Sequence, residues 1–355
     1  MQIDLLRPRT DADWAALQAA WRALEETADS SFFQSWTWIG CRARERYTDP
    51  LLVRATDAGQ VVGLALFNRT APPLTGLLLP SLWLHETGRP PEDSVFIEHN
   101  GPLVARDRPD LLGPMLAAAL RRGRLMLSGV SDTVRDAAAT IGQCHALITR
   151  PAPFAQLAGQ SAGDWLDSLG TSTRYHLRRS RRRYEAKGPI VLRHAADLPE
   201  ALAFLAELAA LHQARWEARG KPGAFAEPAF LAFHRALLAR GLPRNEVQLL
   251  RVAAASTVLG YLYNFHWRGR VYAYQGGFDY AGAGAHQAPG LTCHHAAIEA
   301  AIAAGCTCYD FLAGEARYKT SLSNGVESLH WLAVNSGHGL HDLALMARRR
   351  FSPRG

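Results

Sequence analysis

The chain has few cysteines, no long apolar run and no large share of charged residues, and each shortage excludes a class of protein. Its five cysteines contain no CxxC pair and no spacing typical of zinc ligands, so the sequence predicts reduced thiols and no metal site. No apolar run approaches the roughly 20 residues that cross a bilayer, and the first residues show no basic segment followed by an apolar one. We therefore expect a cytoplasmic protein without a transmembrane segment.

The net charge of +7 is concentrated in one segment of the 355 residues. Residues 171–190 hold six arginines and one lysine against one glutamate, which leaves the remainder of the chain nearly neutral. A protein that binds polyanions along its whole surface spreads its basic residues more widely. The pattern therefore predicts one basic element and no DNA partner.

Two similar halves are indicated by a repeated order of predicted elements. In each half, two helices precede a strand, a tight turn and a second strand. These elements are expected at residues 11–27, 35–47, 51–55 and 61–69, and again at 198–218, 228–240, 247–253 and 258–267. Each second strand holds a glycine, Gly63 or Gly260, which predicts a bulge or a close backbone approach. The repeat predicts an α/β fold with mixed sheets in two tandem domains.

Further elements follow the first pair of strands. The run VFIEHNGPLV predicts a strand that ends at residues 100–102, and residues 111–122 have the pattern of a helix. The run LMLSGV after that helix is typical of a buried strand.

A loop of small residues meets a helix N-terminus late in the chain. The strand Arg270–Asp279 leads into YAGAGAHQAPGL, and Pro289 begins a helix that Gly305 ends. Free N–H groups and the positive end of the helix dipole meet there, an arrangement that suits a phosphate or pyrophosphate. The loop lacks the third glycine of GxGxxG and the GK[ST] of a P-loop, so neither of those sites is predicted. On spacing alone, an ordinary strand–loop–helix connection explains the pattern equally well.

A set of residues in this half of the chain carries a family resemblance. It consists of Tyr175–Arg183, Arg215-Trp216, Gly277–Asp279, Pro289-Gly290-Leu291, Ile298, Gly305, Tyr309–Leu312, Gly314 and Tyr318-Lys319. With these residues, this half of the chain resembles the acyltransferase domain of the CelD/BcsL-type GNAT family. Phe33-Gln34-Ser35 and Trp38 are also similar to the start of such proteins. The family is related to the Fem peptidyltransferases, which have two GNAT-like domains in tandem.

The resemblance implies that the two domains have different roles, one on the acceptor side and one in acyl transfer. Residues 1–158 would form a degenerate GNAT-like domain on the acceptor side. Residues 159–355 would form the acyltransferase domain, with a basic helix at 171–187 before it. The family's pyrophosphate motif, R/Q-x-x-G-x-G/A, is matched poorly, because His286-Gln287-Ala288-Pro289-Gly290 holds its place.

The resemblance also implies an acyl donor. We expect His286, Gln287, Gly290 and Leu291 to bind it, with acyl-CoA, above all acetyl-CoA, as the co-substrate and no permanently bound cofactor. An acyl carrier protein and an aminoacyl-tRNA are the alternative donors that the poorly matched motif leaves open.

Transfer to an amine needs a neutral nucleophile, a polarised carbonyl and a protonated leaving group. We predict Tyr318 or Tyr274 as the proton donor and Lys319 as the group that stabilises the oxyanion or binds donor phosphate. Asp279 or Asp310 would accept the proton of the amine. Packing across strands is the alternative for Tyr274, and capping or pairing with Lys319 is the alternative for Asp310. His294 is expected to be a buried, hydrogen-bonded histidine and not a ligand.

The basic segment predicts a helix over residues 173–187, with Leu177 and Tyr184 on its buried side. Arg174 and Arg178 are expected to bind an anion, as are Arg215 and Trp216 further along the chain. The candidate partners are a tRNA, an acyl carrier protein, a CoA phosphate or an acidic polysaccharide. The alternative is a solvated surface helix without a partner.

These observations lead to an N-acyltransferase of the GNAT type, such as an N-acetyltransferase. It would move an acyl group from acyl-CoA, or from another carrier, to a primary amine of a small molecule or of a cell-envelope or polysaccharide precursor. A Fem-like peptidyltransferase that uses aminoacyl-tRNA is one alternative. A GNAT-fold binding module without catalysis is the other.

Overall fold

The computed structural model describes residues 1–71 and 80–336, and the chain forms two compact units. Of the described residues, unit 1 contains those up to 149 together with 329–336, and unit 2 consists of residues 150–328. Two strands, β7 (Gln143–Gln156) and β13 (Gly325–Asn335), begin in one unit and end in the other. The expected acceptor and donor roles of residues 1–158 and 159–355 stay a prediction.

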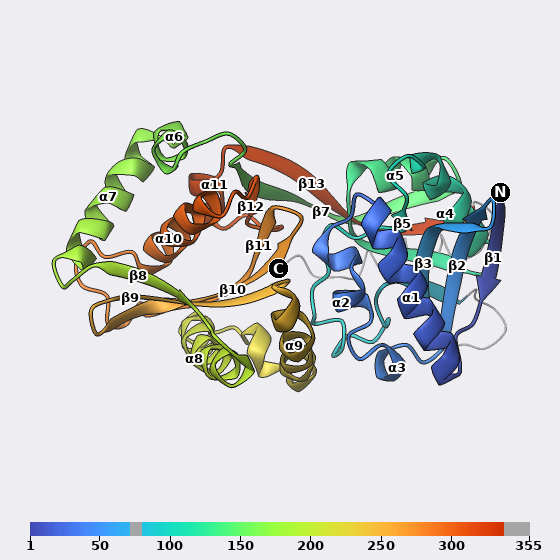
Figure 1. The fold of residues 1–355 in the computed structure, drawn as a ribbon, viewed down its shortest axis with the longest axis horizontal. Coiled ribbons are helices and arrows are strands. Elements are labelled where there is room, and N and C mark those ends of the chain that lie inside the picture. Colours follow the sequence, from blue (N-terminus) through green and yellow to red (C-terminus); the bar gives the residue numbers. More distant parts are fainter. Residues whose placement is uncertain (72–79, 337–355) are drawn as a thin grey trace. The chain divides into compact units, whose positions relative to one another are not determined.

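Unit 1 is a mixed sheet with helices on both faces (Figure 1). Its strand order is β1-β2-β3-β4-β6, β4 and β6 are parallel, and the later part of β13 pairs with β6. Its elements are β1 (Gln2–Leu6), α1 (Asp11–Thr27), η1 (Phe32–Gln34), α2 (Trp36–Ile39), α3 (Ala43–Arg46), β2 (Pro50–Asp57), β3 (Gln60–Thr70), β4 (Ser81–Leu84), β5 (Leu103–Val104), η2 (Pro109–Leu111), α4 (Leu112–Leu120), β6 (Arg124–Val130) and α5 (Asp132–Ala139).

The first helix has the bounds that its apolar spacing predicts. Thr10 and Asp13 form a capping box at its start, which satisfies N–H groups that the helix leaves open. Trp14, Trp21 and Leu24 face the core, and the indole N–H of Trp21 donates to the Gln34 carbonyl at 2.8 Å. The helix is thereby fixed to the segment that follows it.

Two predicted elements of unit 1 are wrong. The helix expected at residues 35–47 is divided into α2 and α3, because Arg42 adopts a left-handed conformation with φ of 52°. The strand expected in VFIEHNGPLV is present only as the two residues of β5. Side chains hold this segment instead: Asn100 accepts from the Gly101 N–H and donates to the Leu84 carbonyl at 3.0 Å.

Unit 2 repeats the arrangement of unit 1. Its strand order is β8-β9-β10-β11-β12, and the later part of β7 pairs with β12. In Figure 1, α8 and α9 cover one face of this sheet and α7 and α10 cover the other. Its elements are α6 (Ala162–Ser168), α7 (Thr171–Glu185), β8 (Ile190–His194), α8 (Leu198–Glu217), η3 (Ala224–Ala226), α9 (Pro228–Gly241), η4 (Leu242–Arg244), β9 (Val247–Ala254), β10 (Thr257–Trp267), β11 (Arg270–Phe278), α10 (Pro289–Ala303), β12 (Cys308–Asp310) and α11 (Arg317–Leu322).

The two central hairpins confirm the predicted duplication. The register between β2 and β3 shifts next to Gly63, and the register between β9 and β10 shifts next to Gly260. A Cβ atom on Gly260 would lie 2.4 Å from the Gly277 carbonyl oxygen, so only glycine fits there. The bulge and the close approach predicted from the two sequences are both present.

None of the helices that the structure describes is long and apolar enough to span a bilayer.

Unit 1 buries a carboxyl group that gives its stability a dependence on pH. Burial, together with the nearby Asp93 carboxylate, raises the pKa of Glu86 from 4.5 to about 8. Between these two values the unfolded chain carries the charge and the folded chain does not, so the free energy of unfolding falls as the pH rises.

We expect Glu86→Gln to be more stable than the parent protein at pH 8, and to lose most of this advantage at pH 5. Glutamine keeps a polar group for Ser128, with which Glu86 is hydrogen-bonded, and it cannot ionise. Urea unfolding of both proteins at the two pH values measures the effect. If the free energies of unfolding of Glu86→Gln and the parent protein differ by the same amount at pH 5 and at pH 8, Glu86 is charged in the folded protein.

Candidate functional site

Two parallel strands separate in the middle of unit 2. β11 has nine residues and β12 has three, and they pair only from Arg270 to Tyr272. The residues of β11 from Ala273 to Phe278 continue past the end of β12. The register with β10 also skips Tyr274, which makes this residue a bulge. The second half of β11 therefore has an edge that no part of β12 covers, at the place where the sequence predicts the donor site.

The helix that follows β11 begins beside this edge. Its N-cap, Ala288, has no side chain that caps the helix. Ser180 of α7 takes part of this role, because its hydroxyl accepts the Ala288 N–H at 2.8 Å and shares a hydrogen bond with Thr292. The N–H groups of Gly290 and Leu291 belong to the first turn and have no acceptor within the helix. The start of α10 is thus fixed by α7 and leaves N–H groups without an acceptor in the helix, as helix starts that bind phosphate do.

Tyr280 lies over the first turn of α10. A Cβ atom on Gly290 would lie 2.8 Å from the Tyr280 hydroxyl and 3.2 Å from the Phe278 ring. The Arg215 guanidinium of α8 lies 4.5 Å from the centre of the Tyr280 ring. One hydroxyl and one cation therefore adjoin the helix N-terminus. The sequence prediction included Gly290 and Arg215 but missed Tyr280, whose only signal is an aromatic residue directly after Asp279.

A stack of rings continues from α10 to α11. The Tyr318 ring lies parallel to His294 at 5.0 Å, and Nδ1 of His294 is 3.1 Å from the Tyr309 hydroxyl. Burial lowers the pKa of His294 to about 3, with the charge of Lys319 as a second cause. Burial also raises the pKa of Tyr318, so its hydroxyl keeps its proton at neutral pH. His294 is the buried, hydrogen-bonded histidine that was predicted.

Lys319 lies in the same neighbourhood. Its Nζ donates to the Ala313 carbonyl at 2.7 Å and to the Leu312 carbonyl at 3.2 Å. Leu312 has a left-handed conformation with φ of 63°, so the turn after β12 is tight. The ammonium group holds this turn and brings a positive charge close to His294.

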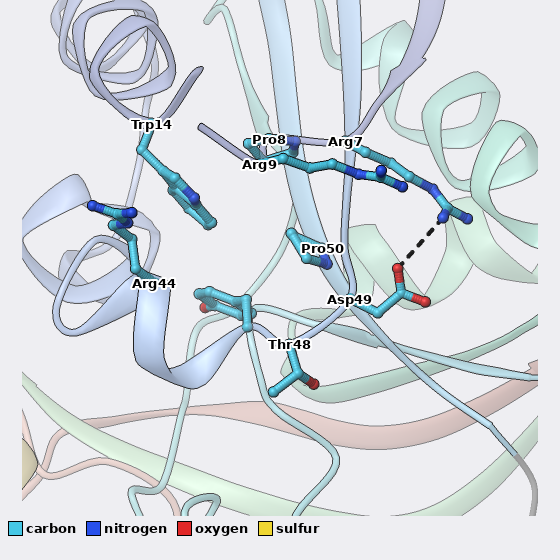
Figure 2. A pocket seen from close by; sticks show the side chains of 9 residues that line it. Arg7, Pro8, Arg9, Trp14, Arg44, Thr48, Asp49 and Pro50 are labelled. Carbon is cyan, nitrogen blue, oxygen red and sulfur yellow. Dashed lines mark ion pairs between the residues drawn. The ribbon is translucent and has the colours of Figure 1, made fainter. Parts of the chain in front are cut away.

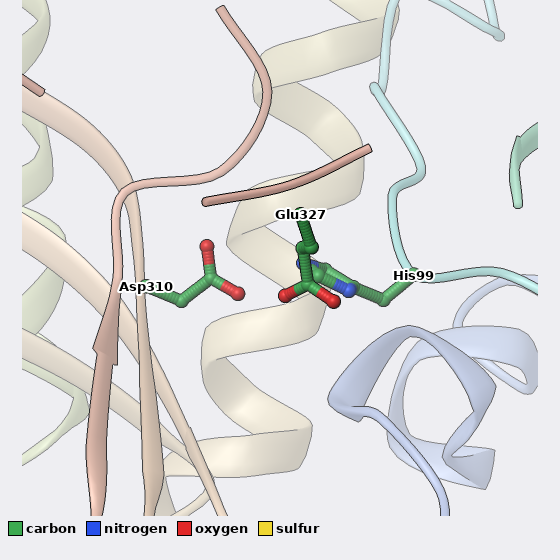
Figure 3. Close-up of side chains that lie close together, drawn as sticks. All are labelled: His99, Asp310 and Glu327. Carbon is green, nitrogen blue, oxygen red and sulfur yellow. The ribbon is translucent and has the colours of Figure 1, made fainter. Parts of the chain in front are cut away.

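Two predicted catalytic residues lie elsewhere. The Tyr274 ring is buried against α9, 4.7 Å from Phe265 and 5.0 Å from His234, which supports the packing interpretation. Asp310 is fully buried and pairs with Arg270 at 2.6 Å, not with Lys319. Figure 3 shows Asp310 turned toward Glu327, which also pairs with Arg270. Because Tyr309 packs with α10 and side chains alternate along a strand, Asp310 faces the opposite side of the sheet.

The predicted loop residues mainly hold the loop together. The Asp279 carboxylate accepts the Gly282 N–H at 2.7 Å, and the amide oxygen of Gln287 accepts the Gly284 N–H at 2.6 Å. His286 is exposed and has a φ of 64°. Leu291 is half-buried at the edge of the core. The part of these residues in donor binding stays a prediction.

The basic helix is α7, and it buries Leu177 and Tyr184 as predicted. Arg174 donates to the Asp167 carbonyl at 2.8 Å, and Arg178 lies 3.5 Å from the Asp167 carboxylate. These two arginines are therefore partly neutralised by α6. Arg182 and Arg183 are exposed and form no ion pair with the residues that the structure describes. The helix keeps an uncompensated cationic surface next to the start of α10.

Unit 1 has a polar hollow of about 380 Å³ at the start of α1 (Figure 2). Arg7 pairs with Asp49 at 3.6 Å across it, and Arg44 pairs with Asp11. The lining of the hollow includes three arginines and one aspartate, so it has an excess of positive charge. Its lining is Arg7, Pro8, Arg9, Trp14, Arg44, Tyr47, Thr48, Asp49 and Pro50.

Comparison with known proteins agrees with the geometry of unit 2. Residues 171–320 match the model of the acetyltransferase (GNAT) domain, which covers α7 through most of α11. No protein with a curated description matches the chain.

Among solved structures, the chain is similar to FemX over 98% of its own length and 99% of that chain, with 10% identity and a TM-score of 0.63. It is also similar to L-PGS from Bacillus licheniformis over 98% of both chains, with 11% identity and a TM-score of 0.56. At such identities the likeness concerns the fold. The fold is α/β with two GNAT-like units in tandem, as the sequence predicted.

Proposed function

We propose that this protein is an N-acyltransferase whose acyl donor binds in unit 2, at the edge of β11 and the first turn of α10. The observation that carries the proposal is the convergence of the free N–H groups of Gly290 and Leu291 with the Tyr280 hydroxyl and Arg215. Backbone donors at a helix N-terminus and an arginine are the usual partners of a phosphate. The GNAT domain match over residues 171–320 supports a CoA thioester as the ligand.

The donor would lie with its pyrophosphate at α10 and its thioester along the open edge of β11. Strand backbone beyond the end of β12 has N–H and C=O groups available for a pantetheine chain, because β12 supplies no partner there. The stacked rings of His294 on α10 and Tyr318 on α11 would form the boundary of the donor site on the side of α10. This arrangement leaves the face covered by α8 for the acceptor.

The chemistry follows from the groups at this place. The neutral amine attacks the thioester carbonyl, a C–N bond forms, and the C–S bond breaks after a tetrahedral intermediate. The Lys319 ammonium stabilises the oxyanion, and the Tyr318 hydroxyl, protonated because burial raises its pKa, gives its proton to the leaving thiolate. The Tyr318 phenolate then takes a proton back from water. The proton that the amine loses passes to a base on the acceptor side, directly or through water. Asp279 remains a candidate for that base.

Thermal unfolding with acetyl-CoA tests the donor site. We expect the melting temperature to rise by several degrees, because a ligand at about 100 times its Kd adds about 2.7 kcal/mol. Gly290→Ala should remove most of this rise, since the new Cβ would lie 2.8 Å from the Tyr280 hydroxyl and displace it from the helix start.

Gly170→Ala is the matched control, because a Cβ at Gly170 meets nothing within 4 Å. It should keep the full response to acetyl-CoA. If neither acetyl-CoA nor longer acyl-CoAs change the melting temperature of the parent protein, a CoA donor is contradicted. An equal response of the Gly290→Ala variant and the parent would contradict this position for it.

A second candidate function is a Fem-like transfer from aminoacyl-tRNA. The observation that favours it is the cationic surface of α7 beside the start of α10, with Arg182 and Arg183 exposed. Binding of tRNA through backbone phosphates would weaken steeply as the salt concentration rises. Stabilisation by charged tRNA with such a salt dependence, and no response to acetyl-CoA, would select this function.

The narrower assignments belong to the same proposal. They are the CelD/BcsL type, a role of unit 1 on the acceptor side, anion binding by Arg174 and Arg178, and an amine of a small molecule or cell-envelope precursor as acceptor. The arginine-lined hollow of unit 1 supports an anionic group on that acceptor. A cytoplasmic location is proposed with them.

A further inference from the structure

His212 of α8 is held in one tautomer by the backbone of β11. The side chain is 8% exposed, and its Nδ1 lies 3.3 Å from the Gly276 carbonyl oxygen. A carbonyl oxygen accepts hydrogen bonds and donates none, so Nδ1 carries the ring proton. The other nitrogen, Nε2, therefore presents a lone pair.

This lone pair has no partner. Nε2 of His212 is buried and forms no hydrogen bond with any residue that the structure describes. The groups around the ring are Trp216 at 5.8 Å, Phe225 at 5.2 Å and the Gly276 carbonyl, and none of them titrates. Arg215 and Glu217 are the charged neighbours along α8. A buried acceptor without a donor is costly. Nε2 of His85 in unit 1 is buried in the same way, so an explanation specific to His212 has to come from its position.

The position of His212 supplies one. Gly276 lies on the part of β11 that continues past β12, within the proposed donor site. On α8, one turn after His212, Arg215 reaches Tyr280 at the start of α10. Helix α8 covers the face opposite to α10, which is the side left for the acceptor.

A short glycine-containing segment covers the ring. A Cβ on Gly223 would lie 3.0 Å from Cδ2 of His212 and closer still to Gln213, so the chain passes directly over α8 here. Residues 217–222 are exposed, and Gly220 has a φ of 69°. Displacement of this segment would open a path from solvent to Nε2.

We propose that His212 is the general base of the reaction and that its Nε2 accepts the proton of the acceptor, a primary amine. The inference rests on the proposed acyl transfer. As the C–N bond forms and the C–S bond breaks, the ammonium proton moves to Nε2 while the thiolate takes a proton from Tyr318. The imidazolium then returns its proton to solvent, and the Tyr318 phenolate takes one from solvent. Burial lowers the pKa of His212, so the ring is neutral and ready to accept at pH 7.

Chemical modification tests the basic nitrogen without any need for turnover. Diethyl pyrocarbonate acylates unprotonated, accessible imidazole nitrogens. We expect peptide mapping of the full-length protein to show faster modification of His212 than of His294, which is buried and hydrogen-bonded to Tyr309. Modification of His212 no faster than that of His294 would overturn the proposal, because the amine of an acceptor could not reach Nε2 either.

Acetyl transfer from acetyl-CoA to glycinamide tests the role. The design compares His212→Asn with His212→Ala, because an asparagine amide can still donate to the Gly276 carbonyl but has no base. For a catalytic base, both variants lose about two orders of magnitude or more in kcat, and the base limb disappears from the pH profile. Rescue by asparagine, with an unchanged pH profile, would show that His212 only positions β11 and would overturn the proposal.

His234→Gln is the burial-matched control, since His234 is a buried histidine of α9 whose Nδ1 is 3.1 Å from the Tyr263 hydroxyl. It should keep the parent pH profile. If the parent protein acetylates no amine although His212 is modified rapidly, the proposed acyl transfer is contradicted, and the role of His212 as its general base is contradicted with it. A transferring parent protein with a fully active His212→Ala variant would contradict the role of His212 alone.

Discussion

Replacing Lys319 with alanine is expected to lower the rate of acyl transfer by about two to three orders of magnitude, the usual effect of removing one group that stabilises an oxyanion. The Lys319 ammonium is next to the His294–Tyr318 stack and contributes to the low pKa of His294. Its loss removes both the positive charge and the two hydrogen bonds that hold the turn after β12. Steady-state kinetics with acetyl-CoA and an amine measures the change.

The matched control is Arg317→Ala, which removes an exposed cation two residues earlier on the same short helix. We expect it to keep the parent rate. Circular dichroism should show an unchanged fold for both variants. Lys319→Arg separates charge from geometry: partial recovery would assign the effect to the charge. Parent turnover by the Lys319→Ala variant would remove this lysine from the mechanism.

Replacing Gly277 with alanine is expected to destabilise the protein by about 3 kcal/mol, at the upper end of what overpacking costs. A Cβ at this position would lie 2.3 Å from the Leu208 carbonyl oxygen and 2.9 Å from its Cα. These are backbone atoms in the middle of α8, so no side-chain rotation relieves the contact. The helix must move away from β11, and the contact between His212 and Gly276 is lost with it. Urea unfolding measures the loss.

Gly276→Ala is the control on the adjacent residue. Its Cβ would lie 2.6 Å from the end of the Phe278 ring, a side chain that can turn aside. We therefore expect a clearly smaller loss of stability than for Gly277→Ala. Equal losses would show that strand flexibility, and not the approach of α8, decides the cost.

Much of the fold could be predicted from the sequence because its signals are local. The apolar spacing of Trp14, Leu17, Trp21 and Leu24 and the cap at Thr10 define α1 to the residue. Proline at the start defines the first residue of α10, and Gly305 defines its end to within one residue. Segment VFIEHNGPLV reads as a strand, but its residues are held by the side chains of Asn100 and His85, contacts that no periodicity reveals.

The site could be predicted in part. The sequence predicted Tyr318, Lys319, Gly290 and Arg215 as site residues, and the structure places them around α10; their part in the reaction stays a prediction. Tyr274 has the packing contacts that were its stated alternative, and Asp310 pairs with Arg270. The sequence could not show this, because strand alternation does not say which face of a sheet a helix will cover. The sequence did not single out Tyr280 and His212, to which we give proposed roles, because an aromatic residue in a loop and a single histidine on a helix carry no spacing signal. Their roles depend on contacts between elements far apart in the chain.

Strands β7 and β13 each begin in one unit and end in the other, and this has a consequence for how the chain folds during synthesis. Strand β6 of unit 1 pairs with β13, where His330 lies opposite Val130, and β13 is synthesised much later than β6. Strand β12 of unit 2 pairs with β7, which the ribosome has already released. Unit 2 can therefore complete its sheet before unit 1, although it begins later in the sequence. An edge of β6 stays unpaired until residues 330–334 of β13 have been synthesised, so the translation of β13, and not that of the first half, sets when the sheet of unit 1 can be completed.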